Sequence, residues 1–505
     1  MKHLFATKSL QVLLKEADGD QRLHRALGPV ALTSLGVGAI IGTGIFVLVG
    51  KAAHDTTGPA LMLSFVVAGL ACIFAALCYA EFASMAPVAG SAYTYAYTTM
   101  GEFWAWIIGW DLILEYAVAS AAVAHGWSHY FQDLLKSGGI IFPAIVGNSP
   151  FDYDTKLGKF VLTGSLFDLP AIFISILMTI ILVVGIRESA RFNVSMVIIK
   201  LAVVFFVIIV GAQYVTPANW HPFAPYGLGG VSFFGHTILG QSGPKGEPLG
   251  MMAGAAVIFF SYIGFDSIST HSEEAKNPKR DVPIGIIASL TICTLLYIAV
   301  AAVLTGMVPY DKIHVDAPVS NAFAQVGMPW AQSLVAAGAL AGITSVLLVM
   351  MLSQPRVLLA MARDGLLPDS FFGAVHPKFR TPWKSTIITG IIVALASSLL
   401  PLSILAELVN IGTLLAFVIV CTAVLIMRKT NPDAERPFRC PLVPLTPILG
   451  IIFCLVLMFS LPWENWLRLV VWLAIGMAIY FTYGYHHSHL GKELNAKTAP
   501  TSNPS

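Results

Sequence analysis

The sequence predicts an all-α integral membrane protein with twelve transmembrane helices, and three observations carry that prediction. Of the 505 residues, 56% are apolar and only 11% are charged, whereas a soluble protein carries about a quarter charged residues. Twelve apolar stretches are long enough to cross about 30 Å of hydrocarbon, which takes about 20 residues each. Lys and Arg gather in alternate connecting segments. Together these features exclude a water-soluble globule, a disordered chain and a disulfide-rich secreted module.

The twelve predicted spans follow one another along almost the whole chain. They are expected near residues 30–50, 60–80, 103–124, 169–186, 194–215, 251–270, 284–308, 330–352, 385–402, 404–427, 443–461 and 466–485. Pro401 separates spans nine and ten by a short break, which predicts a tight helical hairpin. The polar residues before span one lack the apolar core of a cleaved signal peptide, so span one is expected to direct insertion.

Basic residues predict the orientation of these spans. With the N-terminus in the cytoplasm, the inner segments hold 21 Lys and Arg residues and the outer segments hold 7, while Lys200 lies within a span. This excess follows the positive-inside rule and predicts a multi-pass protein of the cell (inner or plasma) membrane with both termini cytoplasmic. The expected order is a cytoplasmic N-terminal segment, a first five-helix half, an extracellular loop, a second five-helix half, spans eleven and twelve, and a disordered cytoplasmic tail. These are residues 1–28, 29–215, 216–249, 250–428, 429–486 and 487–505.

Span one contains the glycine-rich run GVGAIIGTGIF, with Gly36, Gly38, Gly42 and Gly44. Each glycine destabilises a helix by about 1 kcal/mol relative to alanine, and it lets the backbone bend or approach another molecule closely. From this run alone, two interpretations stay open. One is close packing of helices through small residues, and the other is an unwound binding segment.

Span six reads FFSYIGFDSIST, with Gly264 near its middle and the polar residues Ser261 and Asp266 beside it. Spans one and six each begin one five-span half. Interrupted spans at corresponding positions of two halves indicate a substrate site at the bilayer midplane. Free N–H groups of a broken helix bind a carboxylate, and freed carbonyls bind an ammonium group. The pattern therefore predicts a zwitterionic substrate.

Ionisable residues inside the spans are costly unless they are paired or hydrated. Lys200 in span five either extends to the inner membrane surface or acts as a proton-titrating amine. Asp111 and Glu115 share one face of span three. We expect Glu115 to line the cavity and Asp111 to be a structural hydrogen-bonding partner. Glu81 and Glu407 lie near span ends, where a surface role is expected.

Several chemistries are not expected. No basic stripe suggests a nucleic acid partner, and the chain has no GxxxxGK[ST], HExxH or GxSxG motif. Direct ATP-driven pumping and enzyme activity are therefore disfavoured. His486, His487 and His489 form a short cluster without other ligands nearby in sequence, so no metal or cofactor is expected.

Over residues 10–490 the chain resembles the amino acid–polyamine–organocation superfamily, and within it the bacterial relatives of cationic amino acid transporters. The motifs that carry this resemblance are, in order, GVGAIIGTGIFVLVG, ALCYAEFASMAPVAGSAYTYAY, GWDLILEYAVA, ESARFN, FFSYIGFDSISTHSEEAKNPKRDVPIGI, QPRVLLAMARDGLLP and ELVNIGTLLAF. The resemblance implies a LeuT-like fold, with two inverted five-helix repeats plus two additional helices, and transport by alternating access.

The resemblance also implies site residues. The substrate-binding residues are expected to be Ile40, Ile41, Gly42, Thr43, Gly44, Glu115, Phe260, Ile263, Gly264 and Met350. N–H groups and a hydroxyl of the span-one motif would hold the substrate carboxylate, carbonyls from both spans would hold its amino group, and the Phe260 ring would cover it. Lys200 matches a lysine that replaces the cation between spans one, five and eight in proton-coupled members. It is therefore expected to couple transport to protons.

The expected substrate range follows from two residues that act in opposite directions. A bulky, apolar Met350 shortens the side-chain pocket, whereas the Glu115 carboxylate favours a cationic side chain. On balance, proton-coupled symport of small neutral amino acids such as alanine is expected. A cationic amino acid permease, an amino acid exchanger and, more distantly, a non-transporting sensor remain as alternatives. Expected partners are the amino acid, protons and membrane lipid, and the sequence leaves open a single-pass subunit or a bound sterol-like lipid.

Overall fold

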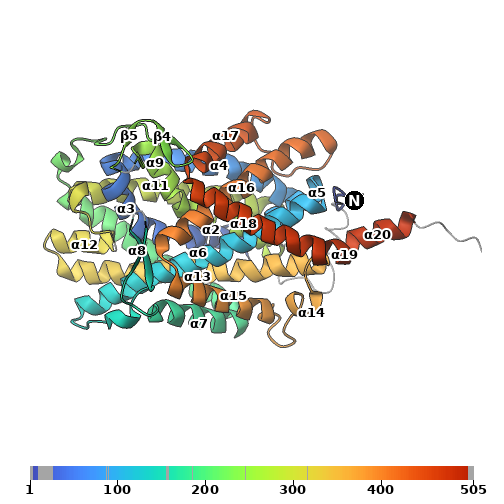
Figure 1. Cartoon of the computed structure of the whole chain (residues 1–505), viewed down its shortest axis with the longest axis horizontal. Coiled ribbons are helices and arrows are strands. Elements are labelled where there is room, and N and C mark those ends of the chain that lie inside the picture. Colours follow the sequence, from blue (N-terminus) through green and yellow to red (C-terminus); the bar gives the residue numbers. More distant parts are fainter. Residues whose placement is uncertain are drawn as a thin grey trace, which may run out of the picture.

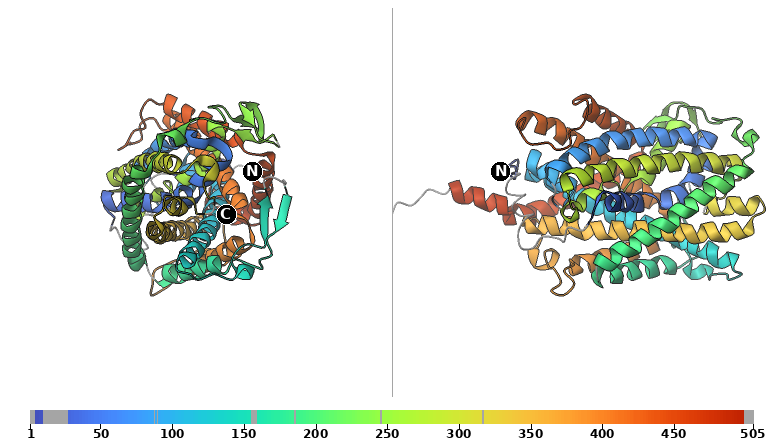
Figure 2. Two further views of the ribbon diagram at one scale, coloured as in Figure 1. Left: turned by 90° about the vertical axis from the view of Figure 1, so that its left-hand side faces the viewer. Right: turned by 180° about the vertical axis from the view of Figure 1, so that it is seen from behind.

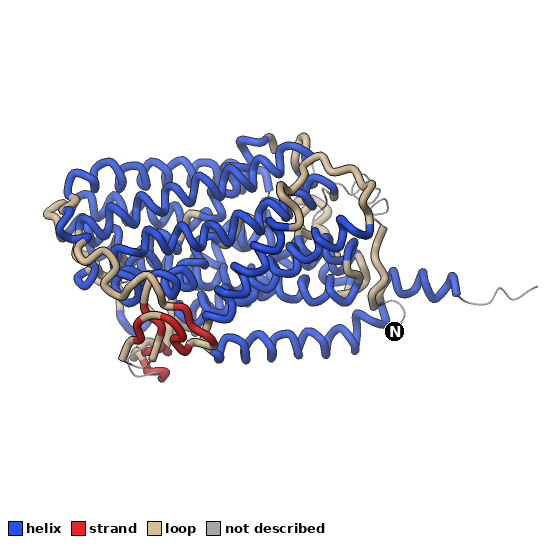
Figure 3. Tube along the Cα trace, turned by 90° about the horizontal axis from the view of Figure 1, so that it is seen from above, coloured by secondary structure: helices blue, strands red, loops and turns tan. Residues whose placement is uncertain are grey.

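The computed structural model describes residues 4–9, 27–86, 88, 90–154, 159–184, 186–244, 246–315 and 317–498. Its long helices run side by side along the long axis of the molecule (Figure 1). The N-terminus and the last helix lie at one end of this axis, and the strands gather near the other end (Figures 2 and 3). The described N-terminal segment and helix α20 therefore lie at the same end of the bundle.

Among the described helices of the first half of the chain, α6 (Glu102–Ser137) is the longest. The α-helices of this half are α2 (Pro29–Ile40), α3 (Val49–Ala52), α4 (Leu61–Met85), α5 (Ala92–Thr99), α6, α7 (Leu169–Val184) and α8 (Ile186–Gly211). Short π- or 3-10-helical pieces are η1 (Gly44–Leu48), η2 (Ala53–Thr57), η3 (Gly58–Ala60), η4 (Ala144–Val146), η5 (Ala212–Tyr214) and η6 (Pro217–Trp220).

The second half repeats the alternation of long and interrupted helices. Its α-helices are α9 (Met251–Ile258), α10 (Ser267–Thr270), α11 (Pro278–Met307), α12 (Pro318–Gln325), α13 (Pro329–Arg363), α14 (Asp369–Phe372), α15 (Trp383–Leu399) and α16 (Leu402–Thr430). They are followed by α17 (Leu445–Ser460), α18 (Trp463–Ile479), α19 (Tyr485–His487) and α20 (His489–Thr498). The short pieces are η7 (Phe259–Tyr262), η8 (Ser272–Glu274), η9 (Tyr310–Lys312) and η10 (Tyr480–Gly484).

The strands form three antiparallel hairpins in the two long loops. These are β1 (Phe151–Asp154) with β2 (Lys159–Leu162), β3 (Val231–Phe233) with β4 (His236–Leu239), and β5 (Gln241–Ser242) with β6 (Pro248–Leu249). In the β1–β2 pair Phe151 lies opposite Leu162, and in the β5–β6 pair Gln241 lies opposite Leu249.

Within the described residues, eight helical segments are long and apolar enough to cross a membrane. Four shorter apolar helices accompany them: α2, α7, α15 and α17. Each of the twelve predicted spans overlaps one of these segments. The prediction of a many-helix membrane protein is therefore confirmed. α6 is longer than the predicted span 103–124, because it continues as a helix to Ser137; over its length it packs along α13.

The structure corrects the prediction for the C-terminal tail, which was expected to be disordered from residue 487. Residues His489–Thr498 form helix α20. The Ser488 hydroxyl accepts a hydrogen bond from the Gly491 amide at 3.0 Å, as an N-cap does. It also donates to Glu102 on α6. A capped first turn bound to a buried carboxylate explains why the polar tail continues as a helix.

The predicted surface role of Glu81 is wrong. Its carboxylate is only 2% exposed and accepts two hydrogen bonds from the Arg428 guanidinium at 2.9 and 2.7 Å. Arg436 donates to it at 3.2 Å, and the Cys440 amide donates at 2.7 Å. Glu81 on α4 therefore anchors the loop of residues 431–444 between α16 and α17. Glu407, by contrast, is 42% exposed beside Arg468.

Candidate functional site

The helices of spans one and six are both interrupted at the residues that the sequence singled out. α2 ends at Ile40, Ile41 is extended with φ −76° and ψ 102°, and helical structure resumes at Gly44. We call residues 41–43 the first break. α9 passes into the 3-10 helix η7, after which Ile263 is extended and Gly264 has φ +118°. Residues 263–266 are the second break, and the positive φ explains the glycine there.

The two interrupted helices lie against each other. A Cβ atom on Gly44 would lie 2.4 Å from the Ser261 Oγ and 2.5 Å from its Cα. A Cβ on Gly264 would lie 3.0 Å from the Ala39 carbonyl oxygen and 2.7 Å from the Met350 Cε. The glycines therefore fit both the packing interpretation and the unwound-segment interpretation, because they allow close helix packing at the residues where helical hydrogen bonding stops.

Tyr297 on α11 ties the two interrupted helices together. Its hydroxyl lies 2.8 Å from the Ile40 carbonyl oxygen and 2.7 Å from the Ser261 carbonyl oxygen. Because a hydroxyl has one hydrogen, it donates fully to only one of these carbonyls at a time. Sequence reasoning missed Tyr297, since an isolated tyrosine in an apolar span has no distinguishing pattern. The Ile40 carbonyl that was expected to bind a substrate amino group thus already has a hydrogen-bonding neighbour.

Two buried hydroxyl groups beside the breaks lack protein partners. The Thr43 Oγ1 and the Ser261 Oγ have no hydrogen bond within the described residues. Both side chains are 1% exposed, and Phe260, Ile263 and Met350 are also buried. Buried polar atoms are rarely left without a hydrogen bond. These two hydroxyls are therefore suited to bind a polar ligand held between the helices.

Lys200 on α8 joins the first break to α13. Its fully buried Nζ donates to the carbonyl oxygens of Gly38 at 2.8 Å and Ile41 at 2.9 Å. It also donates to the Ser345 hydroxyl at 2.9 Å. Three donors thus meet three acceptors. This placement excludes the interpretation in which the amine extends to the membrane surface, and it brings spans one, five and eight together at one ammonium group.

Glu115 lies in a buried acidic cluster rather than beside a cationic partner. Asp266 and Asp111 are its acidic neighbours, and neither Glu115 oxygen has a hydrogen bond in the described part of the chain. Tyr116 donates to the Asp266 Oδ2 at 2.6 Å. Because buried carboxylates repel one another, a proton or a cationic group stabilises such a cluster. The sequence marked Asp266 only as part of a polar run.

An ion pair connects η8 to α13. Arg356 donates to the Glu274 carboxylate, and both side chains are nearly buried. The Leu27 amide donates to the Glu274 carbonyl at 3.0 Å, which holds the segment before α2 against the same turn. Burial would raise the pKa of Glu274, but the Arg356 charge lowers it below its usual value. Burial and Arg356 together lower the pKa of His271 to about 4.

Comparison with known proteins places these features in a known group of sequences. A family model described as amino acid permease matches residues 27–482. The branched-chain amino acid permease BcaP of Bacillus subtilis is 48% identical over 97% of this chain and 99% of that protein. The methylthioribose transporter of the same organism is 45% identical over 97% of this chain and 100% of its own length. The vacuolar cationic amino acid transporter 4 of Arabidopsis thaliana is 38% identical over 84% of this chain and 66% of its own length.

Proposed function

The chain belongs to the amino acid permease family, and from this we propose that it is a proton-coupled symporter of small neutral amino acids. It is a membrane transporter of amino acids and not an enzyme. The proposal concerns its substrate range, its coupling ion and its orientation, with both termini in the cytoplasm of the cell. It includes alternating access by two inverted five-helix repeats, α2–α8 and α9–α16, with α17 and α18 outside them.

The crossing of the two broken helices at Gly44 and Ser261 is the observation that carries the proposal. Amides freed at the first break and the Thr43 hydroxyl form an anion-binding group suited to a carboxylate. The Phe260 carbonyl accepts a hydrogen bond from the Ile263 amide at 3.2 Å and has a second lone pair, so this carbonyl and that of Ile263 suit an ammonium group. An α-amino acid presents both groups on one carbon, so it can bridge the breaks.

We propose that proton coupling acts through Lys200, which lies on α8 and binds the carbonyls at the C-terminal end of α2. The last carbonyls of a helix carry partial negative charge, so a cation there stabilises the helix end by about 0.3–2 kcal/mol. A protonated Lys200 holds Gly38 and Ile41 against α8 and α13. Loss of the proton removes the charge, although two hydrogens remain for the two carbonyls. The end of α2 is then held less tightly, and we propose that it moves with the change of access.

Met350 favours a short, uncharged substrate side chain, because its methyl group packs against Gly264 beside the breaks. The name of the branched-chain permease supports a neutral substrate. A second candidate is cationic amino acid transport. It is favoured by the Glu115 oxygens, which accept no hydrogen bond within the described residues, and by the names of other relatives. The name of the methylthioribose transporter shows that relatives of similar identity differ in substrate. Methylthioribose is therefore tested together with the amino acids.

Uptake into proteoliposomes tests the proposal. Radiolabelled alanine, leucine, arginine and methylthioribose would be supplied with and without an inward proton gradient, to the wild type, Lys200→Ala and Lys378→Ala. Lys378 is an exposed loop lysine and serves as the matched control. We expect gradient-driven alanine accumulation that Lys200→Ala abolishes and Lys378→Ala keeps.

Two other results would overturn parts of the proposal. Uptake that ignores the gradient but requires amino acid inside the vesicles would make the protein an exchanger and Lys200 a structural cation. Arginine or methylthioribose accumulation without alanine accumulation would replace the proposed substrate class.

A further inference from the structure

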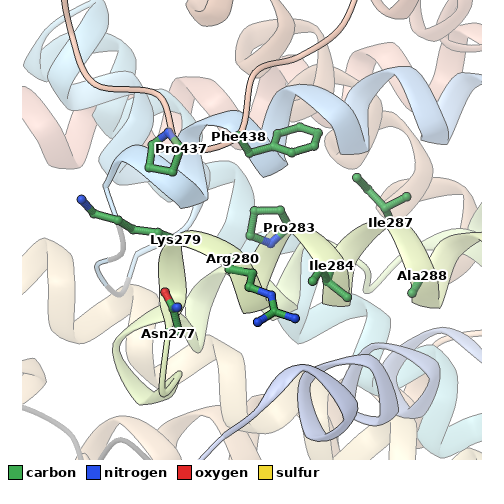
Figure 4. Close-up of a pocket in the computed structure, with 9 residues that line it drawn as sticks. All are labelled: Asn277, Lys279, Arg280, Pro283, Ile284, Ile287, Ala288, Pro437 and Phe438. Carbon is green, nitrogen blue, oxygen red and sulfur yellow. The ribbon is translucent and has the colours of Figure 1, made fainter.

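A surface pocket lies between the start of α11 and the loop of residues 431–444. Its volume is about 560 Å³, and its lining includes Lys279, Arg280, Ile284, Ile287, Pro437 and Phe438. In Figure 4, Pro437 and Phe438 lie across from α11, which forms the opposite wall. The Leu27 carbonyl binds the Lys276 amide just before α11 begins. The pocket therefore lies at the end of the bundle that holds the N-terminal segment.

Buried and partly buried hydrogen bonds hold the loop wall of this pocket. Glu81 binds Arg436, the residue just before Pro437. The Phe438 amide donates to the Ser84 hydroxyl on α4 at 3.2 Å. Arg436 also donates to the Asn431 carbonyl at 2.6 Å. These contacts hold the loop in place, so the cavity is formed before any ligand arrives.

The lining changes from cationic to apolar along α11. Lys279 and Arg280 lie at the beginning of the helix, and Ile284 and Ile287 follow within about 12 Å at 1.5 Å per residue. Lys279 is paired with the exposed Glu435 at 3.1 Å. Arg280 is exposed and has no ion pair within the described ranges. Ile284 is 40% exposed, and α11 is long and apolar enough to continue through the membrane.

We propose that this pocket binds an anionic phospholipid of the cytoplasmic leaflet. The negatively charged head group would lie against Arg280 and Lys279, and an acyl chain would follow Ile284 and Ile287 beneath Phe438. Basic pockets at the membrane surface between spans are suited to such head groups. A free phosphate ion would leave the apolar part of the lining unused, and an uncharged lipid would leave Arg280 unpaired. The choice of leaflet follows from the proposed orientation.

Native mass spectrometry of the delipidated full-length protein tests this binding. Phosphatidylglycerol, phosphatidylcholine with the same acyl chains and inorganic phosphate would be titrated separately. We expect phosphatidylglycerol to bind most tightly. Lys279→Gln and Arg280→Gln should each weaken it about fivefold, because each basic side chain near a membrane surface contributes about 1 kcal/mol. Ala288→Phe, which fills the apolar part of the lining, should weaken binding of both lipids.

Matched control variants are Lys378→Gln and Arg363→Gln, two exposed basic residues outside the pocket. Both should bind phosphatidylglycerol as the wild type does. Unchanged binding in the double variant of Lys279 and Arg280 would overturn the proposal, as would equal affinity for phosphatidylcholine. Phosphate binding that both glutamine variants weaken and Ala288→Phe leaves unchanged would show that the pocket recognises a free anion.

Discussion

Met350 and Glu115 are the two residues that most affect the substrate expected at the breaks. Met350 lies against Gly264, where the backbone of span six turns away from helical geometry. Glu115 lies on α6 among other carboxyl groups. Shape at Met350 and charge at Glu115 therefore make separate contributions to selectivity, and they can be altered one at a time.

Replacing Met350 with serine should widen the substrate range towards arginine. The shorter side chain leaves room for a long guanidinium group and removes apolar contacts, and pocket changes of this size shift selectivity by about tenfold. The ratio of arginine to alanine uptake in proteoliposomes measures this effect. Met351→Ser is the control, because Met351 is also buried on α13. Arginine uptake that stays unchanged in Met350→Ser would count against this position in the pocket.

His271 should make the protein less stable in mild acid. Its pKa is about 4 in the folded protein and 6.5 when it is unperturbed. Between these values the unfolded chain binds a proton that the folded protein does not, so lowering the pH destabilises the fold. The loss reaches about 3 kcal/mol near pH 4. Glu274, with its lowered pKa, adds a loss in the same direction only below about pH 4.5.

Thermal unfolding of the purified protein from pH 7 to pH 4 measures this dependence. His271→Gln should flatten the profile between pH 6.5 and pH 4.5. The exposed His314 gives the control variant His314→Gln, whose profile should match the wild type. Parallel profiles for His271→Gln and the wild type would contradict the assignment.

At the scale of elements, an ion pair and an amide hydrogen bond from the loop of residues 431–444 to α4 converge on one buried carboxylate, that of Glu81. Replacing Glu81 with glutamine should destabilise the protein by about 3–5 kcal/mol, because Arg436 would remain buried without a counter-charge. Glu407→Gln provides the comparison, since that exposed ion pair with Arg468 is worth about 1 kcal/mol or less. Unfolding temperatures of the two variants would give the difference, and equal temperatures would refute the anchoring role.

The sequence predicted most elements because span length and glycine position are local properties. The glycine run of span one left packing and unwinding both open, and its pairing with the Gly264 region of span six at the corresponding position of the second half favoured breaks in both spans. The partners of Glu81, the hydroxyl of Tyr297 beside two carbonyls and the cap of α20 could not be predicted. Each includes a contact between distant segments: Glu81 and Arg428 are 347 positions apart, Tyr297 and Ile40 are 257 apart, and Ser488 and Glu102 are 386 apart. Local pattern therefore locates the site, whereas tertiary contacts decide which of its groups remain available.

At the scale of the whole molecule, the N-terminal segment and helix α20 lie at one end of the bundle, and this placement gives a test of orientation (Figure 1). All six native cysteines are buried, so they give a low background for labelling. Ser242→Cys, in strand β5, should react with a membrane-impermeant maleimide in intact cells. Lys378→Cys should react only after the membrane is permeabilised. The reverse pattern would invert the proposed orientation.

Helix α11 connects the lipid pocket and the breaks mechanically. Pro283 in the pocket lining removes the helical hydrogen bond to the Lys279 carbonyl, so α11 bends most easily there. The 14 residues from Pro283 to Tyr297 form an arm of about 21 Å. A change of about 3° at this pivot would move the Tyr297 hydroxyl by about 1 Å, enough to break its contact with one of the two carbonyls. A lipid bound beside Pro283 would thus change the position of the Tyr297 hydroxyl at the breaks, and membrane composition would affect how far α11 bends during transport.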